Sequence, residues 1–264
     1  MTVRVTVGGA TGWTGQALCT ALRISDDLQL VAGVSRTHAG NDLGNVIAAE
    51  PWGVPVFATV AEAITHADVY VDFTKHHIVK EHVLAAIAAG TQVIVGTSGL
   101  TAADYDDIDA AARAHGVGVI AAGNFAVMAA LAQMAALQVA AHVPQWEVID
   151  YASFTKPDVP SGTARELAEK LSAVHAPKIG VPVEDIAGPK EARGADVDDT
   201  RVHAVRLPGF VVSTEVVFGL AGQRLSIRFD AGDSPQPYAE GVILAIRALD
   251  GRIGLTRGLE SLLR

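Results

Sequence analysis

The chain has 264 residues, of which 50% are hydrophobic and 19% are charged, and its formal net charge is −9. That length and hydrophobic content predict one large folded domain or two modest ones and argue against disorder. The negative charge argues against a nucleic-acid partner or an anionic membrane, because both bind basic surfaces.

The single cysteine, Cys19, cannot form an internal disulfide. No apolar run reaches the roughly 18 residues of a membrane span. The N-terminal residues lack the charged-then-apolar layout of a secretory signal. We therefore expect a cytoplasmic protein without a membrane partner that acts on a small molecule.

The first half of the chain alternates β-branched runs with helical patterns, which is typical of a parallel sheet with crossover helices. Thr101, with Asp104 three residues later, predicts the capped start of one helix, and Gly116 predicts its end. The fold class predicted is α/β, with a Rossmann-type doubly wound parallel sheet. Strands are expected at 3–10, 28–36, 68–74, 91–99 and 117–125, and helices at 14–25, 79–90 and 102–116.

After Asn124 the pattern changes. Three strands in close succession predict an antiparallel or mixed sheet, so the second domain is expected to be α+β with a mixed sheet. Its elements are expected to be helices at 126–143 and 162–175 and strands at 146–154, 201–207, 211–219 and 223–231, followed by a final helix at 238–249.

Gly9, Gly12 and Gly15 stand in G-x-x-G-x-x-G spacing between the first strand and the first helix. Glycines at such a turn let backbone N–H groups approach a pyrophosphate at the helix N-terminus. A merely tight turn is the alternative, but the place after the first strand favours a dinucleotide site. Ser35 and Arg36 end the second strand without an acidic residue, which favours NADPH over NADH because an arginine can bind the 2′-phosphate.

The segment DYASFTKPDVPSGTAREL, residues 150–167, holds an unusual loop before a helix. Ser161, Gly162 and Thr163 stand where that helix begins, so hydroxyl and backbone N–H groups converge on a site of carboxylate size. Lys156 offers a charge or a proton to a reacting centre. On spacing alone, the alternative is a serine or threonine N-cap beside an exposed lysine.

Several short motifs occur in a fixed order: the glycine turn, DFT at 72–74, GTSG at 96–99, GNF at 123–125 and KPDVPSGTA at 156–164. In this combination the chain resembles the dihydrodipicolinate reductases of bacterial lysine and diaminopimelate biosynthesis, over essentially its whole length. The resemblance implies a dinucleotide-binding domain, here 1–125 plus 237–264. It also implies a substrate-binding and oligomerisation domain, here 126–236, whose sheet assembles a homotetramer.

The resemblance also implies site residues. Ser161, Gly162 and Thr163 would bind a substrate carboxylate and Lys156 would act in protonation, while Tyr151 and Ser153 are candidates for assisting the lysine and for contacting the substrate. The candidates for the cofactor site lie in the first turn, at the end of the second strand and in the motifs near the nicotinamide: Gly9, Thr11, Gly12, Trp13, Thr14, Ser35, Arg36, Phe73, Thr74, Gly96, Thr97, Asn124 and Phe125.

Two departures from the family pattern bear on the activity. The family carries a His-His pair four and three residues before the lysine, where this chain has Ala152 and Ser153. An arginine that usually follows the second glycine of the first turn is Trp13 here. His76 and His77 follow the DFT motif, where surface or capping roles are commoner than catalytic ones. The missing imidazoles predict poor or absent activity on the family's usual substrate and NADPH oxidation with another imine or enone carboxylate.

We expect an NADPH-dependent oxidoreductase that delivers hydride to a C=N or conjugated C=C bond of a small carboxylated substrate, with NADH as the alternative cofactor. One alternative function is an imine reductase acting on a different amino-acid-derived ring. Another is a catalytically silent NADPH-binding or sensing protein. The other histidines show no metal-ligand spacing, so no metal site is predicted.

Overall fold

The computed structural model describes residues 2–263, which form two compact units. Within that range, unit one runs up to Val127 and resumes at Pro235, and unit two is Met128–Ser234. None of the helices in the described range is long and apolar enough to cross a membrane.

Unit one is built on a seven-stranded sheet in which every neighbouring pair of strands is parallel. Strands β4 and β6 are buried throughout because helices cover both faces of the sheet, which explains their nearly unbroken apolar sequences. The Rossmann-type α/β prediction is confirmed. In sheet order the strands are β12 (Gly254–Arg257), β6 (Gly118–Ala121), β5 (Gln92–Val95), β4 (Val69–Asp72), β1 (Val3–Gly8), β2 (Leu28–Val34) and β3 (Val56–Phe57).

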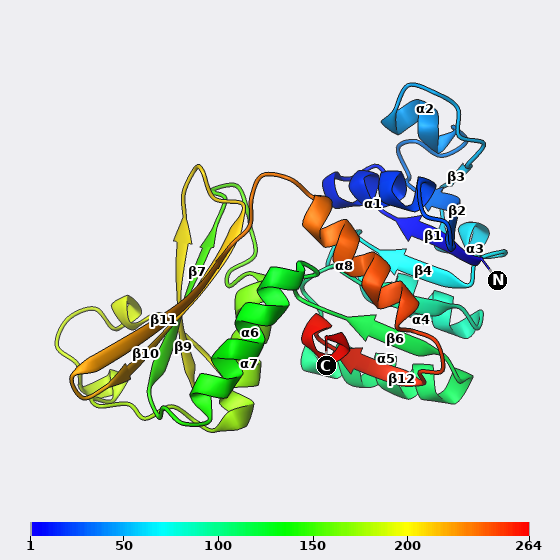
Figure 1. Ribbon diagram of the computed structural model, residues 1–264. Coiled ribbons are helices and arrows are strands. Elements are labelled where there is room, and N and C mark those ends of the chain that lie inside the picture. Colours follow the sequence, from blue (N-terminus) through cyan, green and yellow to red (C-terminus); the bar gives the residue numbers. More distant parts are fainter. Residues whose placement is uncertain (1, 264) are drawn as a thin grey trace. The chain divides into compact units, whose positions relative to one another are not determined.

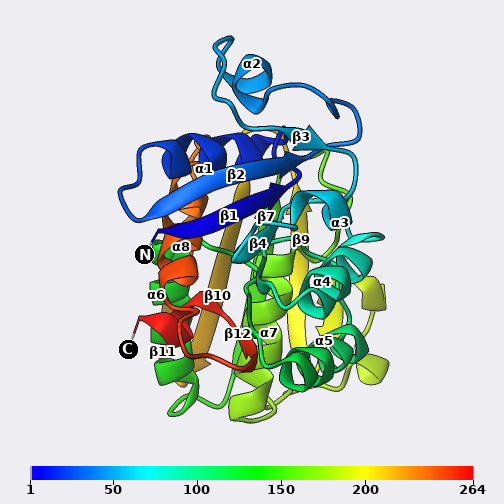
Figure 2. The ribbon, with the colours of Figure 1, turned by 90° about the vertical axis from the view of Figure 1, so that its right-hand side faces the viewer.

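Two layers of helices cover this sheet. The capping box predicted for α5 is present, since Thr101 and Asp104 exchange hydrogen bonds, and Gly116 ends the helix at φ +68°. Figure 2 shows α1 and α8 on one side of the sheet and α3, α4 and α5 on the other. The helices are α1 (Trp13–Arg23), α2 (Leu43–Ile47), α3 (Val60–Ala63), α4 (Val79–Ala88), α5 (Ala102–His115) and α8 (Gln236–Arg247), with a final 3₁₀ turn at Leu259–Leu262.

Unit two contains a mixed five-stranded sheet, as predicted (Figure 1). Strand β7 runs parallel to β9 and antiparallel to β10, and the outer pairs are antiparallel. In sheet order the strands are β11 (Gln223–Asp230), β10 (Val212–Leu220), β7 (Trp146–Ala152), β9 (Thr200–Arg206) and β8 (Ala195–Val197).

Helices α6 (Val127–Ala140) and α7 (Gly162–Val174) pack on one face of this sheet. Their apolar side chains meet Trp146, Val148 and Phe218 in a buried core. Because side chains alternate along a strand, Glu147, Ile149 and Tyr151 of β7 lie on the opposite face, which we call the outer face. Two 3₁₀ turns, Val183–Asp185 and Lys190–Arg193, lie between α7 and β8.

Candidate functional site

The first glycine turn in unit one has the geometry that its spacing predicts. Gly9 adopts φ +71°, and a Cβ atom there would collide with the carbonyl oxygen of Phe73. A Cβ atom at Gly15 would collide with the carbonyl of Gly9, so only glycine lets α1 pack this closely on the turn. The N–H of Gly12 donates to Gly9 O at 2.9 Å, which closes the turn directly before α1. The turn therefore presents the N-terminus of α1 without side chains in the way, as a pyrophosphate requires.

The end of β2 is tied to this turn. The hydroxyls of Ser35 and Thr11 lie 3.0 Å apart, and Ser35 N donates to Phe57 O at 3.0 Å. Arg36 follows directly and is exposed. Because Ser35 is fixed in this way, Arg36 lies close to the first glycine turn.

The loops after β4 and β5 lie against the same turn. The N–H of Phe73 donates to Gly8 O at 3.0 Å, and the Phe73 ring packs edge-on against Phe125 at 6.3 Å. A Cβ atom at Gly96 would collide with the Phe73 ring, so these two loops meet closely. Asn124 accepts a hydrogen bond from Ala126 N at 2.8 Å. The structure therefore brings the DFT, GTSG and GNF segments together in unit one.

Other candidates of unit one lie at the edge of this region. Trp13 begins α1, is 50% exposed and packs edge-on against Tyr238 at 5.8 Å, and Thr14 follows it in the first turn of the helix. His76 and His77 pack edge-on with their ring centres 5.2 Å apart. A Cβ atom at Gly99 would meet His76 Cβ, which places this imidazole beside the loop after β5.

In unit two, the KPDVPSGTA loop is organised by a carboxylate that lies before it. Asp150 is fully buried at the inner face of β7 and accepts hydrogen bonds from Ser161 N at 2.8 Å and Ser161 Oγ at 2.7 Å. Arg206 of β9 completes the cluster, because one of its nitrogens lies 2.8 Å from the Asp150 carboxylate and 2.7 Å from the carbonyl of Asp158. These contacts fix both ends of the loop.

Ser161 is also the N-cap of α7. Its hydroxyl accepts from Ala164 N at 3.3 Å while it donates to Asp150, so the single hydroxyl proton is already engaged. Gly162 and Thr163 form the first turn of α7, where the leading N–H groups of a helix lack acceptors within the helix. Ser161 thus holds the helix start in place.

The ammonium group of Lys156 lies 2.8 Å from the Asp158 carboxylate, and the lysine side chain is 26% exposed. The N–H of Lys156 donates to Ser153 O at 3.0 Å, and the Ser153 hydroxyl lies 3.0 Å from that of Thr155. The lysine is therefore held in a tight turn directly after β7, with its ammonium group paired to a carboxylate.

Tyr151 points away from this loop. It lies on the outer face of the sheet, where its hydroxyl donates to Glu215 at 3.1 Å and its ring stacks on Phe210 and under Arg228. Burial, together with the hydrogen bond to Glu215, raises the pKa of Tyr151. Asp150, by contrast, faces inward towards Ser161, so strand alternation separates Tyr151 from the loop's anchor.

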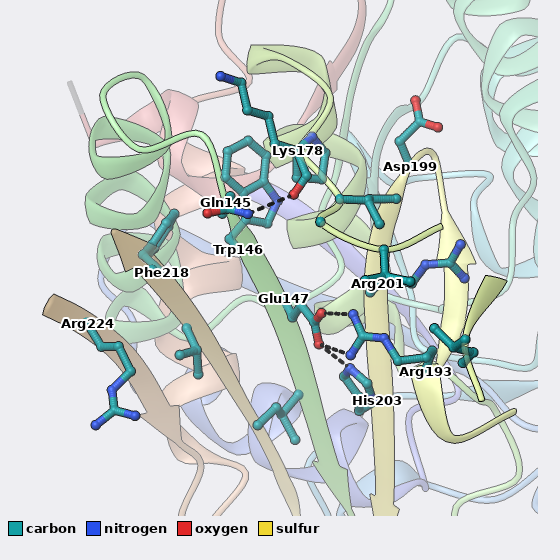
Figure 3. A pocket seen from close by; sticks show the side chains of 18 residues that line it. Gln145, Trp146, Glu147, Lys178, Arg193, Asp199, Arg201, His203, Phe218 and Arg224 are labelled. Atoms are coloured by element: carbon teal, nitrogen blue, oxygen red, sulfur yellow. Dashed lines mark hydrogen bonds and ion pairs between the residues drawn. The ribbon is translucent and has the colours of Figure 1, made fainter. Parts of the chain in front are cut away.

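A pocket of about 760 Å³ also lies over the outer face (Figure 3). At its centre Glu147 binds Arg193 and His203, whose Nε2 lies 2.6 Å from the carboxylate. Burial opposes the charge of Glu147, but hydrogen bonds from Arg193 and His203 outweigh it and hold the pKa of this carboxyl below its usual range. Among the described residues that line the pocket there is none of the predicted site residues.

Sequence reasoning missed Arg206 and two partners of Asp72, namely Tyr70 and His82. The importance of Asp150 could have been predicted from the sequence, because it stands at an inward position of an alternating strand, where a carboxylate requires a partner. Arg206 left none, since it lies 56 residues from Asp150 and meets it only through the pairing of β7 with β9.

Comparison with known proteins identifies the family. The model described as dihydrodipicolinate reductase, N-terminus, matches residues 3–125, and the one described as dihydrodipicolinate reductase, C-terminus, matches residues 124–263. The 4-hydroxy-tetrahydrodipicolinate reductase of Nocardia farcinica is 39% identical and covers 100% of this chain and 99% of its own length. The 4-hydroxy-tetrahydrodipicolinate reductase of Desulfitobacterium hafniense is 36% identical and covers 99% of this chain and 98% of its own length.

Solved structures agree with this assignment. The dipicolinate-bound dihydrodipicolinate reductase from Paenisporosarcina sp. TG-14 is 30% identical, covers 99% of both chains and superposes with a TM-score of 0.76. A scyllo-inositol dehydrogenase from Lactobacillus casei, at 13% identity and a TM-score of 0.63, shares the fold alone. With both family models matched over nearly its full length, this chain belongs to the dihydrodipicolinate reductase family.

Proposed function

We propose that this family member reduces 4-hydroxy-tetrahydrodipicolinate with NADPH in the cytoplasm. As a member of the family it is an NAD(P)H-dependent reductase that acts on a dihydrodipicolinate-type substrate. The observation that carries the finer assignment is the KPDVPSGTA loop, which the Asp150–Arg206 pair holds at the start of α7. The relatives named for this reaction are 36–39% identical over the whole chain. This identity favours their substrate over a different ring and over the other imine or enone carboxylate expected from the missing histidine pair.

Each part of the loop has a chemical role in this proposal. The N-terminus of α7, with Gly162 and Thr163, binds a carboxylate of the substrate through backbone N–H groups and the helix dipole. Ser161 holds that turn through its bonds to Asp150 and Ala164. The ammonium of Lys156 donates a proton as the substrate gains charge, and Ser153 contributes a hydroxyl at the end of β7.

Unit one would hold the cofactor. The nicotinamide cofactor supplies the hydride when bound. The turn from Gly9 to Thr14 cradles the pyrophosphate, and its shape fits this group because side chains at Gly9 and Gly15 would collide with backbone. Phe73, Gly96 and Phe125, together with Thr74, Thr97 and Asn124, form the region assigned to the nicotinamide end.

The substrate is tested by following NADPH oxidation at saturating cofactor. We expect turnover of 4-hydroxy-tetrahydrodipicolinate to exceed that of every member of a panel of cyclic imino acids. Faster turnover of another ring would instead favour the imine reductase alternative. No turnover of any substrate, despite tight NADPH binding, would favour the sensing protein.

Arg36 is the residue proposed to select NADPH. Replacing Arg36 with alanine should weaken NADPH binding by roughly 1.5–3 kcal/mol, the range for a hydrogen bond to a charged group, because the 2′-phosphate loses its guanidinium. NADH binding should hardly change, because NADH has no phosphate there. Cofactor fluorescence titration measures both constants, and Arg23→Ala on α1 is the matched control. Equal losses for both cofactors would remove Arg36 from this role.

We also propose a homotetramer assembled through unit two. The outer face of its sheet carries Ile149, Tyr151 and Val217, which are only half-buried within one chain. The charged cluster around Glu147 shares this face, and α6 and α7 cover only the opposite one. Contacts with another subunit would bury these apolar side chains.

Light scattering should therefore give about four times the 27.4 kDa subunit mass at micromolar concentration. Val217→Asp places a charge in the middle of the outer face and should reduce that mass, because an unpaired charge is costly to bury. Val174→Asp, at an exposed position near the end of α7, is the control and should leave the mass unchanged. A monomeric mass for the unmodified protein would contradict the assembly.

A further inference from the structure

Asp72, at the end of β4, has a fully buried side chain that makes several hydrogen bonds. Its Oδ1 accepts three hydrogen bonds, from Thr74 N at 2.9 Å, Thr74 Oγ1 at 2.7 Å and Thr97 Oγ1 at 2.6 Å. Its Oδ2 accepts from Tyr70 Oη at 2.7 Å and lies 3.3 Å from His82 Nδ1 on α4. One carboxylate thus links β4, the loop after β4, the loop after β5 and α4.

The hydrogen-bond pattern fixes which atom of His82 is the donor. A carboxylate only accepts, and the hydroxyl proton of Tyr70 is already directed at Asp72. His82 Nδ1 must therefore carry the proton that it shares with Asp72. Burial keeps Tyr70 in its protonated form, since burial and the neighbouring Asp72 charge both raise the pKa of the phenol.

His82 is the donor to Asp72 that comes from α4. The other donors, from Tyr70, Thr74 and Thr97, belong to β4 and to the loops after β4 and β5, and a buried carboxylate that loses a hydrogen-bond partner is costly. Burial raises the pKa of Asp72. The hydrogen bonds to its carboxylate, of which the one from His82 has the largest effect, outweigh burial, so the pKa is lowered. Only 21% of the His82 side chain is exposed.

This network contacts the region assigned to the cofactor. A Cβ atom at Gly8 would collide with the Tyr70 hydroxyl, so Tyr70 packs against the residue that directly precedes the first glycine turn. Phe73 is the residue between Asp72 and Thr74, and its ring packs against Gly96 and Phe125. A change at Asp72 would therefore move both loops.

We infer that His82 is a positioning residue for the cofactor: through Asp72 it holds Thr74 and Thr97, and with them the two loops assigned to the nicotinamide. The inference rests on the proposed cofactor site. His82 touches neither cofactor nor substrate in this role. It donates a hydrogen bond to the Asp72 carboxylate, whose other hydrogen bonds fix the loops after β4 and β5.

Two substitutions at His82 separate this role from simple packing. His82→Leu removes the donor, so dissociation constants for NADPH and NADH should both rise roughly tenfold, the scale for one hydrogen bond to a charged group. His82→Asn should restore most of the affinity, because the amide nitrogen is bonded to Cγ just as Nδ1 is. His115→Leu, at an exposed position of α5, is the control and should bind like the unmodified protein.

Hydrogen exchange of the cofactor-free protein provides a second readout. In His82→Leu, exchange should accelerate in peptides covering 73–78 and 96–100 and stay unchanged in β1 and β6, whereas general destabilisation would accelerate it throughout unit one. In the steady state, KM for the cofactor should rise more than kcat falls.

Unchanged cofactor affinity in His82→Leu, or an asparagine variant no better than leucine, would overturn the inference. Failure of the unmodified protein to bind either dinucleotide would overturn the proposed function and the positioning role with it. The exchange pattern would still report separately on whether His82 anchors the loops.

Discussion

Replacing Lys156 with alanine is expected to lower kcat by about 10²-fold or more, the usual scale for removing a general acid. The segment 150–167 contains no histidine, so the loop offers no imidazole to take over the proton. The Lys156 ammonium lies 2.8 Å from the Asp158 carboxylate, which fixes its position in the loop. The loss should therefore appear in kcat, while the dissociation constant for NADPH stays the same.

Lys170→Ala is the matched control for this experiment. Lys170 also pairs with a carboxylate in unit two, Glu166 at 2.8 Å, but it lies on α7 beyond the loop. It should retain nearly full activity. Lys156→Arg keeps a charge but donates protons poorly, because an arginine does not release its proton in proteins, so it should be as slow as the alanine variant. An unchanged kcat in Lys156→Ala would show that the proton comes from elsewhere.

Local signals in the sequence predicted most of the fold. The spacing of Gly9, Gly12 and Gly15 located the turn between β1 and α1, and the Thr101 capping box and Gly116 marked the ends of α5. The close succession of strands after residue 200 indicated the mixed sheet of unit two. In each case, the signal comes from chemistry within a few residues, such as a cap, a turn or an alternating pattern.

Two of the elements that were missed, β3 and β12, depend on contacts distant in sequence. Strand β3 has only two residues and β12 only four, and both form at sheet edges by pairing with one neighbour, β2 and β6 respectively. The same limit applies to the candidate site. The loop around Lys156 was visible in the sequence, but Arg206, which fixes it, reaches Asp150 only because β9 pairs with β7. His82 likewise meets Asp72 only when α4 packs on the sheet.

Replacing Asp150 with alanine is expected to destabilise unit two by about 3–5 kcal/mol, the usual cost of breaking a buried ion pair by removing one partner. Asp150 is fully buried and the Arg206 side chain is only 16% exposed, so the guanidinium would keep its charge without the carboxylate. Ser161 N and Oγ would lose their acceptor as well. Because these bonds hold the start of α7, binding of the substrate carboxylate should weaken together with stability.

Urea unfolding followed by the fluorescence of Trp146, which packs in the core of unit two, measures this loss. A common background with Trp13→Phe and Trp52→Phe makes the signal specific for that unit. Asp196→Ala is the control: its carboxylate also pairs with an arginine, Arg201, but is 49% exposed, so the change should stay below about 1 kcal/mol. Adding Arg206→Met to Asp150→Ala should recover stability, because the uncompensated charge is then gone. If Asp150→Ala were as stable as the control, or if the double variant were weaker than the single one, the buried pair would not be what holds the loop.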